Sequence, residues 1–70
     1  MNTRARVFEY TVLWHPNADE AKNGKKSKMI VERTTLLASD ENSANMSAVM
    51  AIPDDYKDQL DQIEVALRPF

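Results

Sequence analysis

The chain holds few of the residue types that enzymes use for nucleophilic or metal chemistry. His15 is the only histidine, and there is no cysteine. Nucleophilic catalysis needs a base placed beside the nucleophile, and no serine lies in an elbow-like context. Zinc sites depend on cysteine and histidine ligands. We therefore expect His15 to be a surface loop residue, and we expect no catalytic residue, no metal site and no cofactor.

The densest group of carboxylates comprises Asp54, Asp55, Asp58 and Asp61. On a helical turn this spacing aligns Asp54 or Asp55 with Asp58, and hard cations bind carboxylates so arranged. The cluster lacks the central glycine of a calcium-binding loop, however. Negative charge at the start of a helix is favourable on its own, so Asp54 and Asp55 are explained without a metal.

Four lysines surround the single glycine, Gly24; they are Lys22, Lys25, Lys26 and Lys28. Clustered lysines neutralise phosphates and release counterions, which makes this group a candidate polyanion contact. Against nucleic acid, the chain has a net charge of −2, and no aromatic residue interleaves with the lysines. We expect a solvated hairpin tip whose charges also protect a sheet edge from aggregation.

Length and composition indicate one small folded domain with a thin core. The chain has 70 residues, of which 43% are hydrophobic and 29% charged. No apolar run approaches the roughly 18–20 residues of a membrane-spanning helix. The first six residues lead directly into a strand-like run, so we expect no signal peptide.

The charges are distributed unevenly along the chain. Residues 1–33 hold seven Lys and Arg against four Asp and Glu, whereas residues 34–70 hold two against seven. Opposite charges on two parts of one molecule suit head-to-tail association of copies. Chance segregation on a small surface is the alternative explanation.

β-Branched and aromatic residues predict a strand over 5–14, and the runs Met-Ile-Val and Thr-Thr-Leu-Leu predict a second over 28–38. Side chains alternate between the faces of a strand, which places Phe8, Tyr10, Val12 and Trp14 on one side of the first. Residues 15–26 read as a loop, in which Pro16 keeps His15 extended and Asn23-Gly24 supplies a tight turn. The two strands are therefore predicted to form a long hairpin with a protruding connection.

A helix is predicted over 40–51. Ser39 or Asp40 offers an N-cap, and Met46, Val49 and Met50 form an apolar stripe at helical spacing. Ala44, Ser47, Ala48 and Ala51 have small side chains, which allow the rest of the helix to approach a sheet closely. Ile52-Pro53 ends it, because a proline disfavours helical geometry in the preceding residue.

The last segment fits two structures. A helical turn over 54–60 followed by a strand over 62–68 is favoured, since a third strand stabilises a hairpin that is marginal alone. A helix over 54–68 fits the apolar spacing of Tyr56, Leu60, Ile63 and Leu67 equally well.

Together these elements predict an α+β fold, a single domain over residues 1–70 with the order β-β-α-β. One main helix covers one face of a three-stranded sheet, and its crossover leaves the second and third strands parallel, which allows the first to lie between them. The other face stays uncovered, and uncovered apolar surface usually marks a partner site. Free sheet edges can also accept another strand.

The aromatic side chains of the first strand form either the core or a binding face. Tyrosine and tryptophan are enriched at protein interfaces, and the chain ends in Arg68-Pro69-Phe70. We therefore name Phe8, Tyr10, Trp14 and Phe70 as candidates for apolar contacts with a partner.

Several short runs resemble small uncharacterised proteins encoded by tailed bacteriophages. These are TTLLA at 34–38, DE at 40–41, IPDDY at 52–56, LDQIEV at 60–65 and RPF at 68–70, with YTVLW at 10–14. The resemblance covers the second half of the chain and the first strand. It implies a viral origin and favours a strand for the last segment, but it brings no assigned site residues.

We expect a non-catalytic phage protein that acts as a self-associating or particle-attached assembly module, such as a capsid or tail accessory subunit. One alternative is a phage-encoded binder that inhibits or redirects a host protein, its acidic surface over 54–61 imitating a nucleic-acid backbone. A second is a nucleic-acid-binding module that uses the lysine loop. The expected partner is protein, as a homo-oligomer, a phage particle or a host protein, with no membrane. The expected location is the virion or the host cytoplasm.

Overall fold

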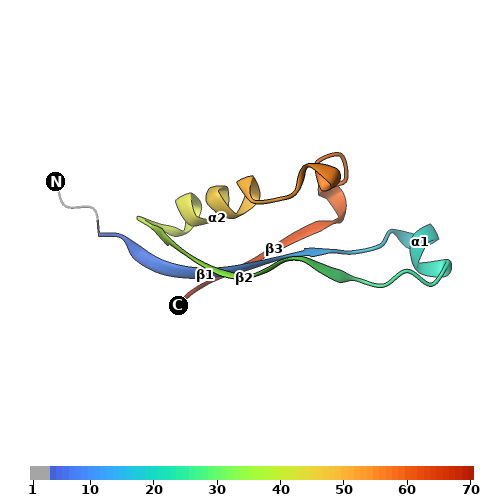
Figure 1. Cartoon of the computed structure of the whole chain (residues 1–70), viewed down its shortest axis with the longest axis horizontal. Helices are drawn as coiled ribbons and strands as arrows, with labels where there is room; N and C mark the ends of the chain where they lie inside the picture. The colour runs from blue at the N-terminus through green and yellow to red at the C-terminus, as the bar shows by residue number, and fades with distance from the viewer. Residues whose placement is uncertain (1–3) are drawn as a thin grey trace.

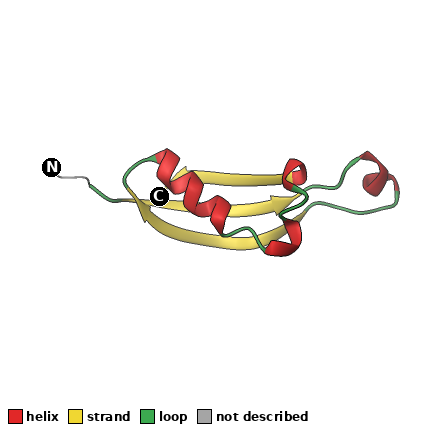
Figure 2. Ribbon diagram, turned by 90° about the horizontal axis from the view of Figure 1, so that it is seen from above, coloured by secondary structure: helices red, strands yellow, loops and turns green. Residues whose placement is uncertain are grey.

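The computed structural model describes residues 4–70, which form one three-stranded sheet with a helix on one face (Figures 1 and 2). The elements, in order, are β1 (Arg6–Trp14), α1 (Ala18–Lys22), β2 (Lys28–Ala38), α2 (Glu41–Met50), the 3-10 turns η1 (Asp54–Tyr56) and η2 (Leu60–Gln62), and β3 (Ile63–Pro69). The strand order is β2-β1-β3, and both outer strands run antiparallel to β1. The predicted α+β class is thereby confirmed.

The alternation of β1 divides its side chains between a covered and an open face. Phe8, Tyr10, Val12 and Trp14 all lie buried, on the side that α2 covers. Leu67 and Val65 of β3 stand opposite Tyr10 and Val12 in the register, and they pack against the same core. Because a central strand has neighbours on both sides, its apolar side chains form most of the core.

Helix α2 approaches the sheet through its alanines. Ala44 and Ala48 are fully buried, whereas Met46, Val49 and Met50 are exposed, Met50 to 81%. The apolar stripe predicted from their spacing therefore lies on the outer side of the helix. The two alanines are four positions apart in the sequence, so they share one face of the helix. The small alanine side chains let the backbone of α2 lie close above the aromatic rings of β1.

Strand β2 contains two irregularities opposite β1. The register steps from Tyr10↔Thr34 to Val12↔Val31 and then to Leu13↔Met29. β2 therefore holds one extra residue in each step, as in a β-bulge. The second step brings the neighbours Ile30 and Val31 both against the core, although strict alternation would place them on opposite faces.

The connection predicted as a loop over 15–26 contains the short helix α1. Asn17 and Glu20 form a capping box, in which the Asn17 side chain accepts from the Glu20 N–H at 2.8 Å and the Asn17 N–H donates to the Glu20 carboxylate at 3.0 Å. After the helix, Gly24 adopts a φ of 88°. Its N–H donates to the Ala21 carbonyl and that of Lys25 to the Glu20 carbonyl, the pattern of a Schellman motif. Both ends of this short helix are thus fixed locally, and the segment extends beyond the sheet (Figure 1).

The last segment is a strand. β3 pairs with β1 from Trp14↔Ile63 to Phe8↔Pro69, so the alternative of a helix over 54–68 is excluded. The turn predicted over 54–60 is divided into η1 and η2, with the Tyr56 carbonyl accepting from the Gln59 N–H between them.

The alanine contact predicts a sharp difference between two positions of α2. We expect Ala48→Leu to lower the free energy of unfolding by about 1–3 kcal/mol, because added methylenes have no space between helix and sheet. Met46→Leu, on the exposed side, should change it by less than about 0.5 kcal/mol. Urea denaturation measures both values, and equal effects would show that α2 is not held through its alanines.

The helix caps predict a dependence of stability on pH. The backbone N–H of Asn17, followed by the Gln62 side chain, lowers the pKa of Glu20, and the Ser43 N–H lowers the pKa of Asp40. A carboxyl whose folded pKa is depressed stabilises the fold above its unfolded pKa, and this contribution is lost as the pH falls through the folded pKa.

We therefore expect the melting temperature to fall as the pH is lowered below about 4, the ordinary range of carboxylates. The double variant Glu20→Gln/Asp40→Asn should melt lower at pH 7 and show a weaker acid dependence. Asp58→Asn serves as the control, since Asp58 caps neither helix. A double variant with the full wild-type pH profile would contradict this account.

Candidate functional site

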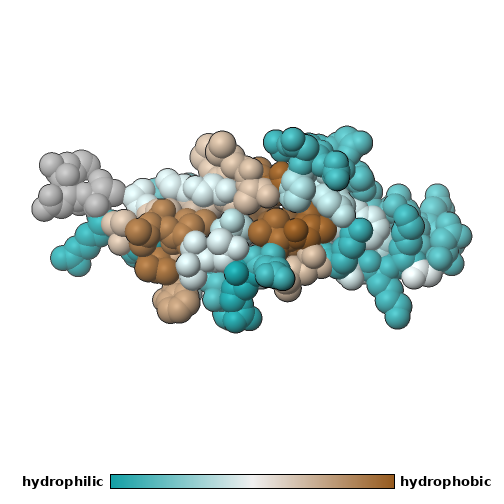
Figure 3. Space-filling model, in the orientation of Figure 1, coloured by the Kyte–Doolittle hydropathy of each residue, from teal (hydrophilic) through white to brown (hydrophobic). Residues whose placement is uncertain are grey.

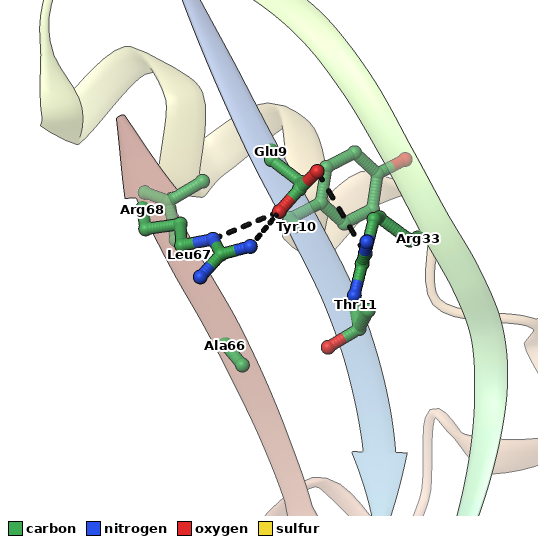
Figure 4. Close-up of a pocket in the computed structure, with 7 residues that line it drawn as sticks. All are labelled: Glu9, Tyr10, Thr11, Arg33, Ala66, Leu67 and Arg68. Atoms are coloured by element: carbon green, nitrogen blue, oxygen red, sulfur yellow. Dashed lines mark hydrogen bonds and ion pairs between the residues drawn. The ribbon is translucent and has the colours of Figure 1, made fainter. Parts of the chain in front are cut away.

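The centre of the open sheet face holds an ionic group formed by Glu9, Arg33 and Arg68. Glu9 is only 8% exposed, although no helix covers this side of the sheet, and it is the buried charged residue of the described chain. The Arg68 Nε and Nη2 lie 2.8 and 2.7 Å from the Glu9 Oε1, and the Arg33 Nε lies 3.7 Å from the Oε2 (Figure 4). The arginines themselves cover the carboxylate, since their alkyl stems can lie along the sheet.

The strand register brings this group together. Glu9 stands directly opposite Arg68 in the β1–β3 pairing, and opposite Thr35 in the β1–β2 pairing. Arg33, two residues before Thr35, reaches the other carboxylate oxygen diagonally. Cross-strand pairs of opposite charge stabilise a sheet in this way.

Both arginines keep most of their surface available to a partner. Each side chain is 68% exposed, and a guanidinium carries five N–H donors in a fixed planar arrangement. Arg68 uses two of its nitrogens on Glu9 and Arg33 approaches with one. They line a shallow cleft of about 280 Å³ with Thr11 and Ala66. Two arginines against one carboxylate leave a positive centre suited to carboxylate or phosphate groups.

Apolar side chains lie on either side of this centre. Val7 pairs with Leu37 near one end and Leu13 pairs with Met29 near the other; Leu37 is 68% exposed. Phe70 joins the first pair, because its N–H donates to the Val7 carbonyl at 3.0 Å, and its ring is 79% exposed. Figure 3, which views the sheet edge-on with α2 above it, shows apolar surface in separate brown areas with hydrophilic groups between them. We call the face formed by these residues and the ionic group the open sheet face.

The predicted interface residues divide between the two sides of the molecule. Phe8, Tyr10 and Trp14 are buried on the covered side of the sheet, where the Trp14 indole N–H donates to Gln59 in the segment after α2, so the prediction that they contact a partner is corrected. Only Phe70 of the four lies exposed. Alternation on β1 sends the aromatic rings to the covered side and leaves Val7, Glu9, Thr11 and Leu13 on the open one. No local sequence pattern indicates that Glu9, Arg33 and Arg68 form one group, because only the strand register brings them together.

A second surface lies on the outer side of α2. Met46, Val49 and Met50 are exposed at i, i+3 and i+4 spacing, so they share one side of the helix. Carboxylates flank them in sequence: Asp40 and Glu41 precede the stripe, and Asp54, Asp55 and Asp58 follow it. We call this surface the helix face.

Three of the four predicted lysines line one cleft. Lys25, Lys26 and Lys28 border a cleft of about 430 Å³ together with the rings of Trp14 and Tyr56. Lys22 does not line it. The sequence order places no aromatic residue among the lysines, but Trp14 pairs with Lys28 across the hairpin and η1 brings Tyr56 to the same place.

His15 connects two segments instead of standing alone in a loop. Its Nδ1 lies 2.7 Å from the Ser27 Oγ and its Nε2 lies 2.7 Å from a Glu64 carboxylate oxygen. A serine, a histidine and a carboxylate in contact are the components of a nucleophilic triad. Here His15 and Glu64 are about half exposed, and none of the three lines the clefts described above. The contacts fasten the α1 connection to β3.

The acidic residues after α2 do not converge on one point. Asp54 pairs with Lys57 at 3.1 Å. Within residues 4–70, no three His, Cys, Asp or Glu side chains are grouped closely enough to hold a metal ion. In the same part of the chain, no helix has the length and apolar character needed to cross a membrane.

Comparisons with protein-family models, with curated proteins and with solved structures gave no match to this chain.

The ionic group predicts unequal roles for the two arginines. We expect Arg68→Ala to lower the free energy of unfolding by about 1–2 kcal/mol, because it removes two short charged hydrogen bonds from a buried carboxylate, reduced by the exposure of the arginine. Arg33→Ala should cost less than about 0.5 kcal/mol, since its contact is long and exposed. Urea denaturation of both variants provides the measurement. A larger loss for Arg33→Ala would contradict the assignment.

Proposed function

We propose that the chain is a non-catalytic assembly module whose copies stack head to tail. The open sheet face of one copy packs on the helix face of the next. The observation that carries this proposal is the complementary character of the two faces: both carry exposed apolar side chains, the centre of the open sheet face bears Arg33 and Arg68, and carboxylates flank the stripe of the helix face.

The open sheet face supplies apolar groups around a positive centre. Leu37 and Phe70 are the most exposed apolar side chains at one of its ends. Arg33 and Arg68 have donors beyond those that Glu9 uses. A surface that is apolar at its ends and cationic in its centre repels its own copy and attracts an apolar surface bearing carboxylates.

The helix face supplies those features. Met46 and Met50 project from α2 with exposures of 68% and 81%, and flexible methionines adapt well to a binding partner. Asp55 and Asp58 follow the helix, and neither forms an ion pair among the described residues. These carboxylates are therefore available to the arginines of a neighbouring copy.

The architecture of the domain supports the same arrangement. A sheet is most stable when both of its faces are covered, and here α2 covers one. The α2 of a second copy would supply the missing layer. Such a contact joins two different surfaces, so it continues from copy to copy and produces a ring or an open filament. Either product suits a component of a larger particle.

The resemblance to small proteins of tailed phages agrees with this role. A repeating, particle-attached subunit such as a capsid or tail accessory protein needs self-association and no catalytic group. The phage origin and the particle rest on that resemblance, whereas the stacking contact rests on the two faces.

The test is a pair of variants that each damage one face. Leu37→Lys alters the open sheet face and Met50→Lys alters the helix face, and both side chains are so exposed that folding should be unaffected. Light scattering after size-exclusion chromatography, over a hundredfold range of concentration, should show the native chain associating and each variant as a monomer. Mixed together, the two variants should form a 1:1 dimer, because each retains the face that the other needs.

Ala21→Lys, on exposed α1, is the matched control and should associate like the native chain. One variant that still associates on its own would show that the contact joins like faces, and a mixture of the two variants that stays monomeric would overturn the head-to-tail contact. A native chain that is monomeric at every concentration would overturn self-association and favour the alternative of a binder for a host protein.

A further inference from the structure

We propose that the cleft between the α1 connection and η1 is a nucleotide-binding site. It takes the phosphate of a free nucleotide, or of a nucleotide in a single strand, on Lys25 and Lys26, with the base against Tyr56. This site goes beyond the contact proposed for self-association, with which it shares only Asp55.

The lysines of this cleft form no close ion pair, although the pKa of Glu20, lowered first by the Asn17 N–H, is lowered further by the charge of Lys25. Lys25, Lys26 and Lys28 form no ion pair with a carboxylate in the described chain. Glu20 lines the same cleft, but its Oε1 accepts the Asn17 N–H at 3.0 Å and the Gln62 side chain at 2.7 Å. The carboxylate is thereby held in the capping box, and the ammonium groups remain available to an external anion.

The cleft also contains an aromatic platform. The Lys28 Nζ lies 5.2 Å from the centre of the Trp14 ring and 5.5 Å from that of Tyr56, within the range of a cation–π contact. Trp14 is fixed in turn, because its indole N–H donates to the Gln59 side chain at 3.0 Å. One ammonium is therefore held between two rings, and Tyr56 is only partly buried. Bases stack on aromatic rings with little dependence on sequence, and the half-buried Tyr56 lines the cleft.

Size and charge together define the ligand. A volume of about 430 Å³ lies in the range of small-ligand sites, and it exceeds what a phosphate ion alone would fill. Three lysines against Glu20 and Asp55 leave one positive charge in the lining. Cations for a phosphate next to a ring for a base match a nucleotide better than an aliphatic acid, which would use the lysines alone.

The single tryptophan makes the site directly observable, since Trp14 lies in the cleft and no other tryptophan contributes to the fluorescence. The protein is titrated with adenosine monophosphate, with a 12-nucleotide oligothymidylate and with inorganic phosphate, at 50 and 200 mM salt. We expect both nucleotide probes to change the emission. For the oligonucleotide, two or three phosphate contacts predict a log–log salt slope of about −1.4 to −2.1.

Exposed lysines provide both the test variant and its control. Lys25→Gln/Lys26→Gln should weaken binding at least tenfold with unchanged melting, because both lie in the exposed turn after α1. Lys57→Gln should bind like the native chain, since Lys57 pairs with Asp54 outside the cleft. Tyr56→Leu should weaken the nucleotides more than it weakens phosphate.

The probes separate the two sources of the ligand. Tighter binding of the oligonucleotide would identify a single strand, and equal affinity for the monophosphate would identify a free nucleotide. Inorganic phosphate that binds as tightly as both would overturn the proposal, because the base would then contribute nothing. Unchanged emission up to millimolar nucleotide at 50 mM salt would also overturn it, as would equal losses in Lys57→Gln.

Discussion

The close approach of α2 to the central strand is the constraint on which the rest of this structure depends. Ala44 and Ala48 occupy the contact and are fully buried, so the large apolar side chains of the core come from the sheet. Phe8, Val12 and their neighbours on β1 fill that volume. Because the helix meets the sheet through its smallest residues, Met46, Val49 and Met50 must lie on its outer side. The packing that stabilises the monomer thus also creates an apolar surface that the monomer does not cover.

The opposite side of the sheet has an ionic group at its centre. Glu9 lies at the centre of β1, where a carboxylate would be costly to bury unpaired, and Arg68 and Arg33 reach it from the two neighbouring strands. Their stems shield the carboxylate while their guanidinium groups stay in solvent. In the proposed contact, charge at the centre of this face would limit non-specific association and favour a partner that brings carboxylates. The two large faces of the molecule therefore differ in charge but share an apolar character.

Local patterns predicted the elements, whereas long-range register determined the site. Alternation and the many β-branched and aromatic residues of 5–14 were sufficient to place β1, and the apolar and β-branched residues of 28–38 were sufficient to place β2. The spacing of the large apolar residues of α2 identifies its exposed side, because the buried side consists of alanines, which are only weakly hydrophobic compared with methionine. The three-residue spacing of Asn17 and Glu20 matches a capping box, but these residues lie in a segment that was predicted as a loop. Glu9 and Arg68, 59 residues apart, could not be paired without the β1–β3 register.

The connection around α1 is long for a hairpin, yet the structure fastens it at several points. His15 contacts both Ser27 and Glu64, and Gln62 donates to the His15 carbonyl and to Glu20. The His15 N–H donates in turn to the Gln62 carbonyl at 2.8 Å. These contacts join α1, β1 and β3 at one end of the sheet, so the lysine-lined cleft is held at a fixed place relative to both large faces. In a stack of copies, this arrangement would present the same cationic cleft once per subunit. The spacing between the clefts would be regular, because the connection is held to the sheet; a flexible hairpin would not keep it constant.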